Sequence, residues 1–198
     1  MTAKLTLDDI ADLRAYERER EAFRTEIIAL KRRRRVGVGP FVTVLFENRE
    51  TIRFQIQEMA RVEKILTDDG IQSELDTYNP LIPEPGALAA TLFIELTSKD
   101  DLMTWLPMLV GIERAVQLRV GDIVVPARPD PEHERQLTRE TITPSVHYIH
   151  FELQPAQVDA ISADAAVVSL AIAHEHYQHS TELDGATIGE LARDLTGS

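Results

Sequence analysis

Short apolar runs separated by helical stretches constrain this chain more than any other feature of its sequence. Four such runs have the length of a strand: FVTVLF (41–46), LAATLFIEL (88–96), SVHYIHFEL (145–153) and AAVVSLAIAH (165–174). A fifth, AVQLRV (115–120), is shorter. Strands that follow one another with helices inserted irregularly are typical of an α+β domain. We therefore expect a mostly antiparallel sheet with helices packed on one face.

The stretches between the apolar runs predict the helices and the irregular parts. Thr6 and Asp9 have capping-box spacing, which predicts a long N-terminal helix over residues 6–34. A second helix is expected from Arg49 to Asp68, and residues 122–144, with their prolines, are expected to form a long loop or an irregular hairpin. The length of 198 residues favours a single domain over 1–198.

Composition excludes several kinds of protein. The chain contains no cysteine, so it cannot by itself ligate an iron–sulfur cluster, and any metal must be held by His, Asp, Glu or backbone oxygen, which suits iron, manganese or zinc. A net charge of −12 argues against a nucleic-acid partner. No apolar run approaches the length of a membrane span and the N-terminus lacks a signal-peptide pattern, so we expect a cytoplasmic protein without a membrane partner.

The basic run KRRRR (31–35) is the one feature that runs against this acidic balance. It falls at the expected end of the first helix, where cations complement the helix dipole and the last carbonyls. That structural interpretation is favoured, and a patch for an acidic partner protein is the alternative.

The histidines near the C-terminus predict a metal site. Alternation along a strand places His147 with the apolar side chains of its run, and His174 with those of the later run. If these two runs pair as a hairpin, the two imidazoles meet on the inward face. A metal ion would satisfy them there, and a buried histidine that donates to a carbonyl is the alternative.

The second helix offers carboxylates for such a metal. Helical periodicity places Glu63 inside the apolar stripe and Glu58 at its edge. A carboxylate in that position is costly unless it is paired or ligates a cation. The alternative is a salt bridge to an arginine of the first helix.

A small-molecule pocket is a separate possibility. Tyr78 and Asn79 lie in a Pro-rich stretch and form either a turn or part of a pocket wall. Together with Glu50 and Arg61 they could frame a ligand, with the Arg61 guanidinium holding a carboxylate.

Five segments carry a resemblance to a known family: FENRETIRFQIQEMARVE, YNPLIP, LAATLFIEL, SVHYIHFEL and the His174-x-x-Tyr177 spacing. Over nearly the whole chain they resemble an uncharacterised bacterial family, domain of unknown function 3501. The positions that match its pattern are Glu47, Asn48, Glu50, Gln57, Glu58, Arg61, Glu63, Tyr78, Asn79, His147, His174 and Tyr177. The usual proline after the histidine is Glu175 here, and His176 is particular to this chain.

The resemblance implies a small single-domain bacterial protein. It also implies that the genes of this family lie near those of rubrerythrin-like proteins and iron–sulfur oxidoreductases, which suggests a link to redox or iron physiology. It also adds Tyr177 to the candidate pocket.

Three functional hypotheses follow. The leading one is a metal-binding protein with His147, His174 and Glu63 or Glu58 as ligands. The others are a non-catalytic interaction or assembly module that partners a redox protein, and a small-molecule-binding pocket protein. Whether the chain is an enzyme stays open. An interrupted apolar stripe on the first helix (Tyr16, Phe23, Ile27, Leu30) predicts a homodimer.

Overall fold

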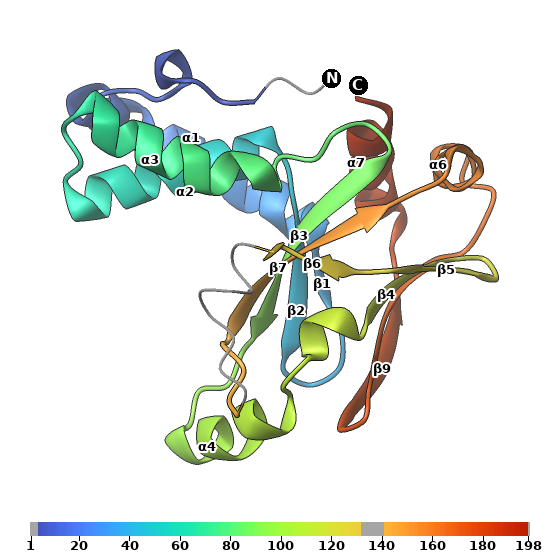
Figure 1. The fold of residues 1–198 in the computed structure, drawn as a ribbon. Helices are drawn as coiled ribbons and strands as arrows, with labels where there is room; N and C mark the ends of the chain where they lie inside the picture. Colours follow the sequence, from blue (N-terminus) through green and yellow to red (C-terminus); the bar gives the residue numbers. More distant parts are fainter. Residues whose placement is uncertain (1–3, 132–140, 198) are drawn as a thin grey trace.

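The computed structural model describes residues 4–131 and 141–197 and confirms the α+β class (Figure 1). The helices are α1 (Leu13–Arg34), α2 (Arg49–Glu63), α3 (Asp68–Tyr78), α4 (Lys99–Met108), α6 (Pro155–Ser162) and α7 (Gly185–Thr196), with 3-10 turns η1 (Leu7–Asp9), η2 (Asn79–Leu81) and η3 (Ile112–Arg114). The strands are β1 (Arg35–Gly37), β2 (Val42–Glu47), β3 (Ala87–Ile94), β4 (Val116–Val120), β5 (Ile123–Pro126), β6 (Arg128–Pro129), β7 (Val146–Glu152), β8 (Val168–His174) and β9 (Tyr177–Glu182). None of the helices in this described part is long and apolar enough to cross a membrane.

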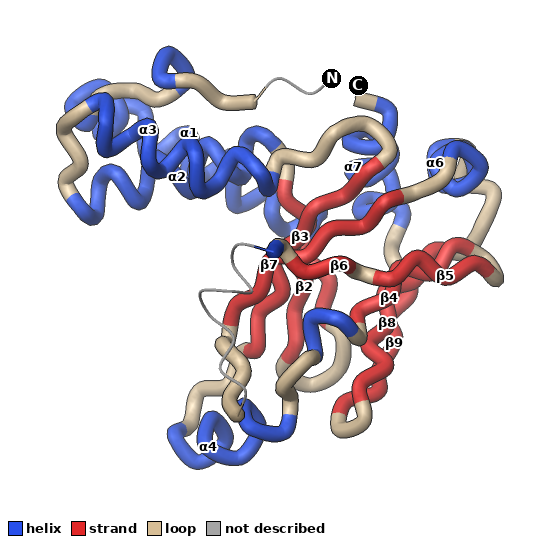
Figure 2. The backbone as a smooth tube through the Cα atoms, viewed as in Figure 1, coloured by secondary structure: helices blue, strands red, loops and turns tan. Residues whose placement is uncertain are grey.

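The strands form two antiparallel sheets where one was expected (Figure 2). Sheet A has the order β1-β2-β3-β7-β6, and sheet B has the order β5-β4-β8-β9. Only Ala127 separates β5 from β6, so one extended stretch joins an edge of each sheet. At the opposite edges, the hydroxyl of Tyr177 in β9 donates a hydrogen bond to the carbonyl of Val38, next to β1. The two sheets therefore meet at both edges and enclose one core.

That core is built from alternate residues of the central strands. Each buried aliphatic or aromatic side chain contributes about 1.5–3 kcal/mol relative to exposure. The side chains involved include Val44, Phe46, Leu92, Ile149 and Phe151 from sheet A, Val116, Leu118, Leu170 and Ile172 from sheet B, and Ile161, Leu191 and Leu195 from α6 and α7. The alternation predicted for residues 145–153 is confirmed, because the odd-numbered positions of β7 from 147 to 151 are buried in this core.

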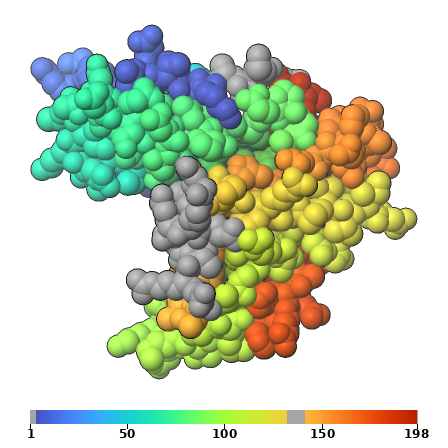
Figure 3. Space-filling model, viewed as in Figure 1, coloured from blue at the N-terminus to red at the C-terminus, as the bar shows by residue number. Residues whose placement is uncertain are grey.

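Helices α1, α2 and α3 form a layer that projects beyond the sheets on one side (Figure 3). The long N-terminal helix ends at Arg34 as predicted, but it begins at Leu13 and not at residue 6. The Thr6–Asp9 capping pair exists and closes the turn η1. The chain leaves helical geometry after this turn because the side-chain amide of Gln57 binds both the backbone N–H and the carbonyl of Ala11.

The second predicted helix, Arg49–Asp68, ends earlier, at Glu63, and a further helix that was not predicted begins at Asp68. Lys64 adopts a left-handed conformation with φ 56° and ends α2, and Thr67 starts α3 by accepting a hydrogen bond from the Gly70 N–H at 3.2 Å. Gly70 lies in the first turn of α3. The N–H groups of the first helical turn have no intrahelical acceptor, so a Gly is tolerated there better than in the helix interior.

The predicted hairpin of the two C-terminal runs is wrong. β7 pairs with β3 and β6 in sheet A, whereas β8 pairs with β4 and β9 in sheet B. β7 has a neighbour on each side, which leaves no free edge for β8. Within 122–144, the structure adds β5 and β6 to the expected loop, and residues 132–140 lie outside the described part of the chain.

The apolar stripe of the first helix is covered within the chain. Tyr16 and Ile27 are buried, and Phe23 makes edge-to-face contacts with Tyr16 and with Phe54 of α2, at centroid distances of 6.5 and 5.7 Å. The homodimer stays a prediction, but this stripe does not motivate it.

Candidate functional site

A cavity of about 220 Å³ lies between helices α1–α3 and the face of sheet A that points away from sheet B. The register of the strands explains its floor. Leu45 in β2, Thr91 in β3 and Tyr148 in β7 are direct cross-strand partners, so their side chains stand in one row on that face. The remaining lining residues are Lys31, Glu47, Ile52, Gln55, Tyr78, Leu81, Phe93 and Val146.

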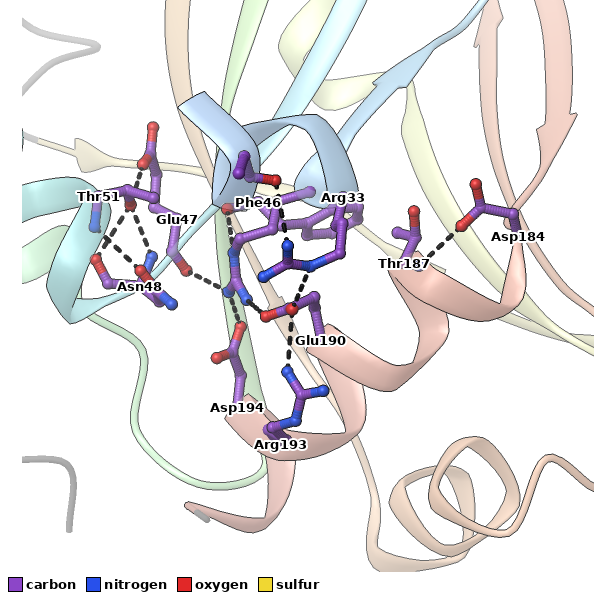
Figure 4. Close-up of polar contacts among 12 residues, drawn as sticks. Arg33, Phe46, Glu47, Asn48, Thr51, Asp184, Thr187, Glu190, Arg193 and Asp194 are labelled. Atoms are coloured by element: carbon purple, nitrogen blue, oxygen red, sulfur yellow. Dashed lines mark hydrogen bonds and ion pairs between the residues drawn. The ribbon is translucent and has the colours of Figure 1, made fainter. Parts of the chain in front are cut away.

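Glu47, the last residue of β2, is a buried carboxylate with a fixed orientation. Its Oε1 accepts a hydrogen bond from the Thr91 hydroxyl at 2.6 Å, and its Oε2 accepts one from the Thr51 hydroxyl at 2.5 Å. Thr51 lies in the first turn of α2, where it also completes the capping box with Asn48 (Figure 4). Each carboxylate oxygen therefore has a donor from a rigid element, which holds the group in place before any ligand arrives.

Two tyrosines line the cavity together. Tyr78 lies beside Gln55 and Tyr148 in the cavity wall, close enough for these side chains to influence its pKa. Burial raises the pKa of both phenols, and the neighbouring charges of Glu74 (at Tyr78) and Glu47 (at Tyr148) act in the same direction. Both side chains therefore stay neutral at physiological pH and act as hydrogen-bonding groups.

Lys31 brings a positive charge to the cavity from the last turn of α1. Its ammonium lies 5.4 Å from the centroid of the Phe54 ring. Burial lowers its pKa, although the charge of Glu47 acts in the opposite direction. No carboxylate among the described residues forms an ion pair with it. The cavity thus combines one unpaired cation, one oriented carboxylate and two phenols, a set that can bind a small polar molecule and exchange a proton with it.

The two histidines predicted to share a metal lie in different sheets. His147 is buried on the core side of sheet A, where burial lowers its pKa against the opposing effect of Glu113. His174 uses both ring nitrogens in hydrogen bonds: Nε2 donates to the carbonyl of Val110 at 3.1 Å, and Nδ1 accepts from the His176 N–H at 3.2 Å. In this arrangement His174 is a structural histidine.

The predicted carboxylate ligands lie elsewhere again. Glu58 accepts hydrogen bonds from Tyr16, Arg20 and Arg61, and these donors, Arg20 first, lower its pKa to about 2. A salt bridge to the first helix was the alternative for Glu63, and the structure places such a bridge at Glu58, with Arg20. The inward position of Glu63 is wrong: the residue is exposed, because α2 ends there beyond its packing surface.

Within the described residues, no group of three or more potential metal ligands comes together. Metal binding through His147, His174, Glu58 or Glu63 stays a prediction.

Of the five predicted pocket residues, Tyr78 lines the cavity and the others do not. Asn79 binds the backbone of Leu5 through both ends of its amide. Arg61 is paired with Glu58 and Glu17, and Glu50 with Arg49 and Arg53. The buried Tyr177 hydroxyl lies between the sheets, where it accepts from the N–H groups of Phe41 and Val42 and donates to Val38.

Two arginines of the basic run KRRRR are used inside the molecule, and Figure 4 shows one of them, Arg33, beside Glu190. Arg34 is fully buried, donates to the carbonyl of Phe46 at 3.0 Å, and pairs with Glu190 and Asp194 of α7. Arg33 also pairs with Glu190, at 2.8 Å. The favoured structural interpretation therefore accounts for these two arginines, and the run ties the end of α1 to the C-terminal helix.

The sequence did contain signals for some of the missed cavity residues. Thr91 is a polar residue in the middle of an apolar strand. Lys31 follows the buried Ile27 by four positions, which places both on one helix face. Glu47 and Gln55 carry no comparable signal, because their place depends on how α2 packs against the sheet.

Comparison with known proteins places the chain in a family. The model of the family described as "Protein of unknown function (DUF3501)" matches residues 4–195. The chain belongs to the DUF3501 family. A crystal structure described as a novel protein of unknown function from Burkholderia pseudomallei K96243 is 40% identical in sequence, with a TM-score of 0.89 over 98% of this chain and 100% of that one. No curated protein matches the chain.

The DUF3501 assignment confirms the resemblance, and the similar structure shares the fold over its whole length. Neither description names an activity, a substrate or a cofactor. The link to redox or iron physiology and a redox-protein partner stay predictions, and the function is argued from the site itself.

Proposed function

We propose that the protein binds a small polar organic molecule with an anionic group in the cavity between α1–α3 and sheet A. The observation that carries the proposal is Lys31, a partly buried cation that lines the cavity and has no ion-pair partner among the described carboxylates. A buried charge without a partner is costly, and an anionic ligand group would supply one.

The other lining groups support a polar and small ligand. Tyr78, Tyr148 and Gln55 offer hydrogen bonds, and Leu45 and Phe93 offer apolar surface. The volume of about 220 Å³ is below the roughly 300–1,000 Å³ typical of drug-sized ligands. The pre-oriented carboxylate of Glu47 favours a ligand that also carries a hydrogen-bond donor.

Thermal unfolding with acetate, pyruvate, succinate and inorganic phosphate tests the proposal. A ligand present at 100 times its Kd stabilises the folded state by about 2.7 kcal/mol. For a chain of this size that corresponds to a rise in Tm of roughly 5–10 °C. We expect at least one of these anions to raise the Tm, and calorimetry to give one binding site per chain.

Lys31→Met should abolish the rise, because it removes the cation and keeps the length of the side chain. Arg32→Gln is the matched control: Arg32 is exposed on the same helical turn, and its variant should respond to the ligand as the wild type does. An unchanged response in Lys31→Met, or no response of the wild type to any anion at millimolar concentration, would contradict the proposal.

A further inference from the structure

A second site lies on the opposite face of sheet A, at a buried glutamate that the cavity does not use. Glu113 belongs to the turn η3 between α4 and β4, and its side chain is 5% exposed. Its Oε2 has no hydrogen-bond partner among the described residues. A buried carboxylate oxygen without a donor is costly unless a cation lies beside it.

The imidazole of His147 faces this oxygen, whereas the guanidinium of Arg114 lies beside the other one, with its Nε 4.0 Å from Oε1. Nδ1 of His147 lies 3.7 Å from Glu113 Oε2, and its side chain is 6% exposed. His147 stands on the core face of β7, directly across from Leu92 of β3. Both side chains are almost fully buried, so bulk water screens the pair little.

The third member is Thr143, whose hydroxyl lies 3.0 Å from Nε2 of His147. If Nε2 carries the hydrogen and donates it to Thr143, the lone pair of Nδ1 points at the carboxylate of Glu113. Two acceptors then face each other across 3.7 Å. That separation exceeds the 2.7–3.2 Å of an ordinary N–H···O hydrogen bond, so a shared proton does not span it well.

A metal ion fits the separation. Two bonds of about 2.1 Å that open at about 120° hold their ligand atoms about 3.6 Å apart. Mixed nitrogen and oxygen donors suit zinc, iron(II) and manganese(II). A ligating histidine usually donates its other ring N–H to a fixed acceptor, which is the place of Thr143 here.

We propose that Glu113 Oε2 and His147 Nδ1 bind a divalent transition-metal ion, with Thr143 as the group that orients the imidazole. Two protein ligands leave coordination positions for water or a small anion. This site shares His147 with the metal hypothesis drawn from the sequence and replaces its other ligands.

Metal analysis of protein purified without a histidine tag tests the site. After chelator treatment, zinc, manganese(II) and anaerobic iron(II) are each offered and the bound metal is measured. We expect about one equivalent of at least one metal per chain. If each of the three metals binds at less than about a tenth of an equivalent per chain, the proposal is overturned. In that case a proton, and not a metal, balances the carboxylate.

Variants assign the ligands. Glu113→Gln and His147→Gln should each lose the metal, and circular dichroism shows whether each is folded. Thr143→Val removes no ligand, so it should keep the fold and weaken the metal affinity by about 10–100-fold. Wild-type metal affinity in folded Glu113→Gln, or in Thr143→Val, would overturn the assignment.

The chain offers a matched control. Nε2 of His150 lies at the same 3.7 Å from a carboxylate oxygen of Asp130, but these two side chains are 28% and 15% exposed. His150→Gln should keep the metal, and its loss there would overturn the assignment. Lys31→Met should keep it too, so failure of the anion proposal and failure of the metal proposal are distinguishable.

Discussion

Arg34 and Lys31 lie three residues apart at the end of α1, and the structure uses them in opposite ways. Arg34 is completely buried and has two carboxylate partners and two backbone carbonyls as acceptors. Lys31 is partly buried, contacts an aromatic ring and has no carboxylate partner among the described residues. The same basic run therefore contains one cation committed to the fold and one available to a ligand.

Burial of a charge therefore does not by itself indicate function. A buried cation with all its donors occupied holds elements together, whereas a partly buried cation that faces a cavity and forms no ion pair is a candidate for binding. The predictions below test whether the two kinds of site respond to substitution as this distinction requires.

Arg34→Met should have the largest effect. The variant leaves Glu190 and Asp194 of α7 without their buried partner, and breaking a buried ion pair in this way costs about 3–5 kcal/mol. Urea denaturation measures the free energy of unfolding. Arg32→Gln, on an exposed side chain of the same run, should change it by less than about 0.5 kcal/mol. Equal losses in both variants would remove the distinction.

Tyr177→Phe should destabilise by about 1–3 kcal/mol, because it leaves a carbonyl and two backbone N–H groups without their partner between the sheets. Tyr78→Phe is the comparison in the cavity. Tyr78 lines the cavity and is only partly buried, so we expect a smaller loss. Chemical denaturation of both variants gives the two values, and a reversed order would contradict the placement of Tyr177 as a structural residue.

Glu58→Gln should destabilise by about 1 kcal/mol at neutral pH, as expected for a partly exposed ion-pair network. The folded pKa of about 2 lies below the ordinary value of 4.5. The contribution of this carboxylate is therefore complete above pH 4.5 and is lost as the pH falls toward 2. Stability measured across this range should decline less steeply in Glu58→Gln than in the wild type. Parallel pH profiles would show that the network does not shift this pKa.

Lys31→Met should have the smallest effect on folding. The variant gives up a cation–π contact worth about 0.5–1 kcal/mol and removes the cost of a partly buried charge. The free energy of unfolding should stay within about 1 kcal/mol of the wild type. A loss as large as that of Arg34→Met would mean that Lys31 is a structural cation as well.

Local signals predicted the elements whose hydrogen bonds and packing are local or periodic. The alternation in β7 and the end of the first helix at Arg34 follow from the residues themselves. The start of that helix does not, because Gln57, 46 positions away, takes the backbone groups of Ala11. β9 was missed because it is an edge strand with mostly exposed polar side chains, which a sequence pattern does not separate from a loop.

The candidate site depends still more on distant parts of the chain. Tyr78 could be named from the sequence, but the row of Leu45, Thr91 and Tyr148 exists only because three strands pair in one register. The predicted metal pair failed to assemble for the same reason. Whether His147 meets His174 or Glu113 is decided by which sheet each strand joins.

The order and periodicity of the residues were enough to predict the α+β class, the absence of cysteine chemistry, the faces of β7 and a cluster of cations at the end of the first helix. It could not determine which of those cations would be paired. The carboxylates that bind Arg34 lie 156 and 160 residues further along the chain, and only the packing of α7 against α1 brings them together. Charge pairing in a folded protein acts over a few ångströms in space and does not depend on distance along the chain. The tertiary structure therefore decides that Lys31 forms no ion pair with the carboxylates of residues 4–131 and 141–197.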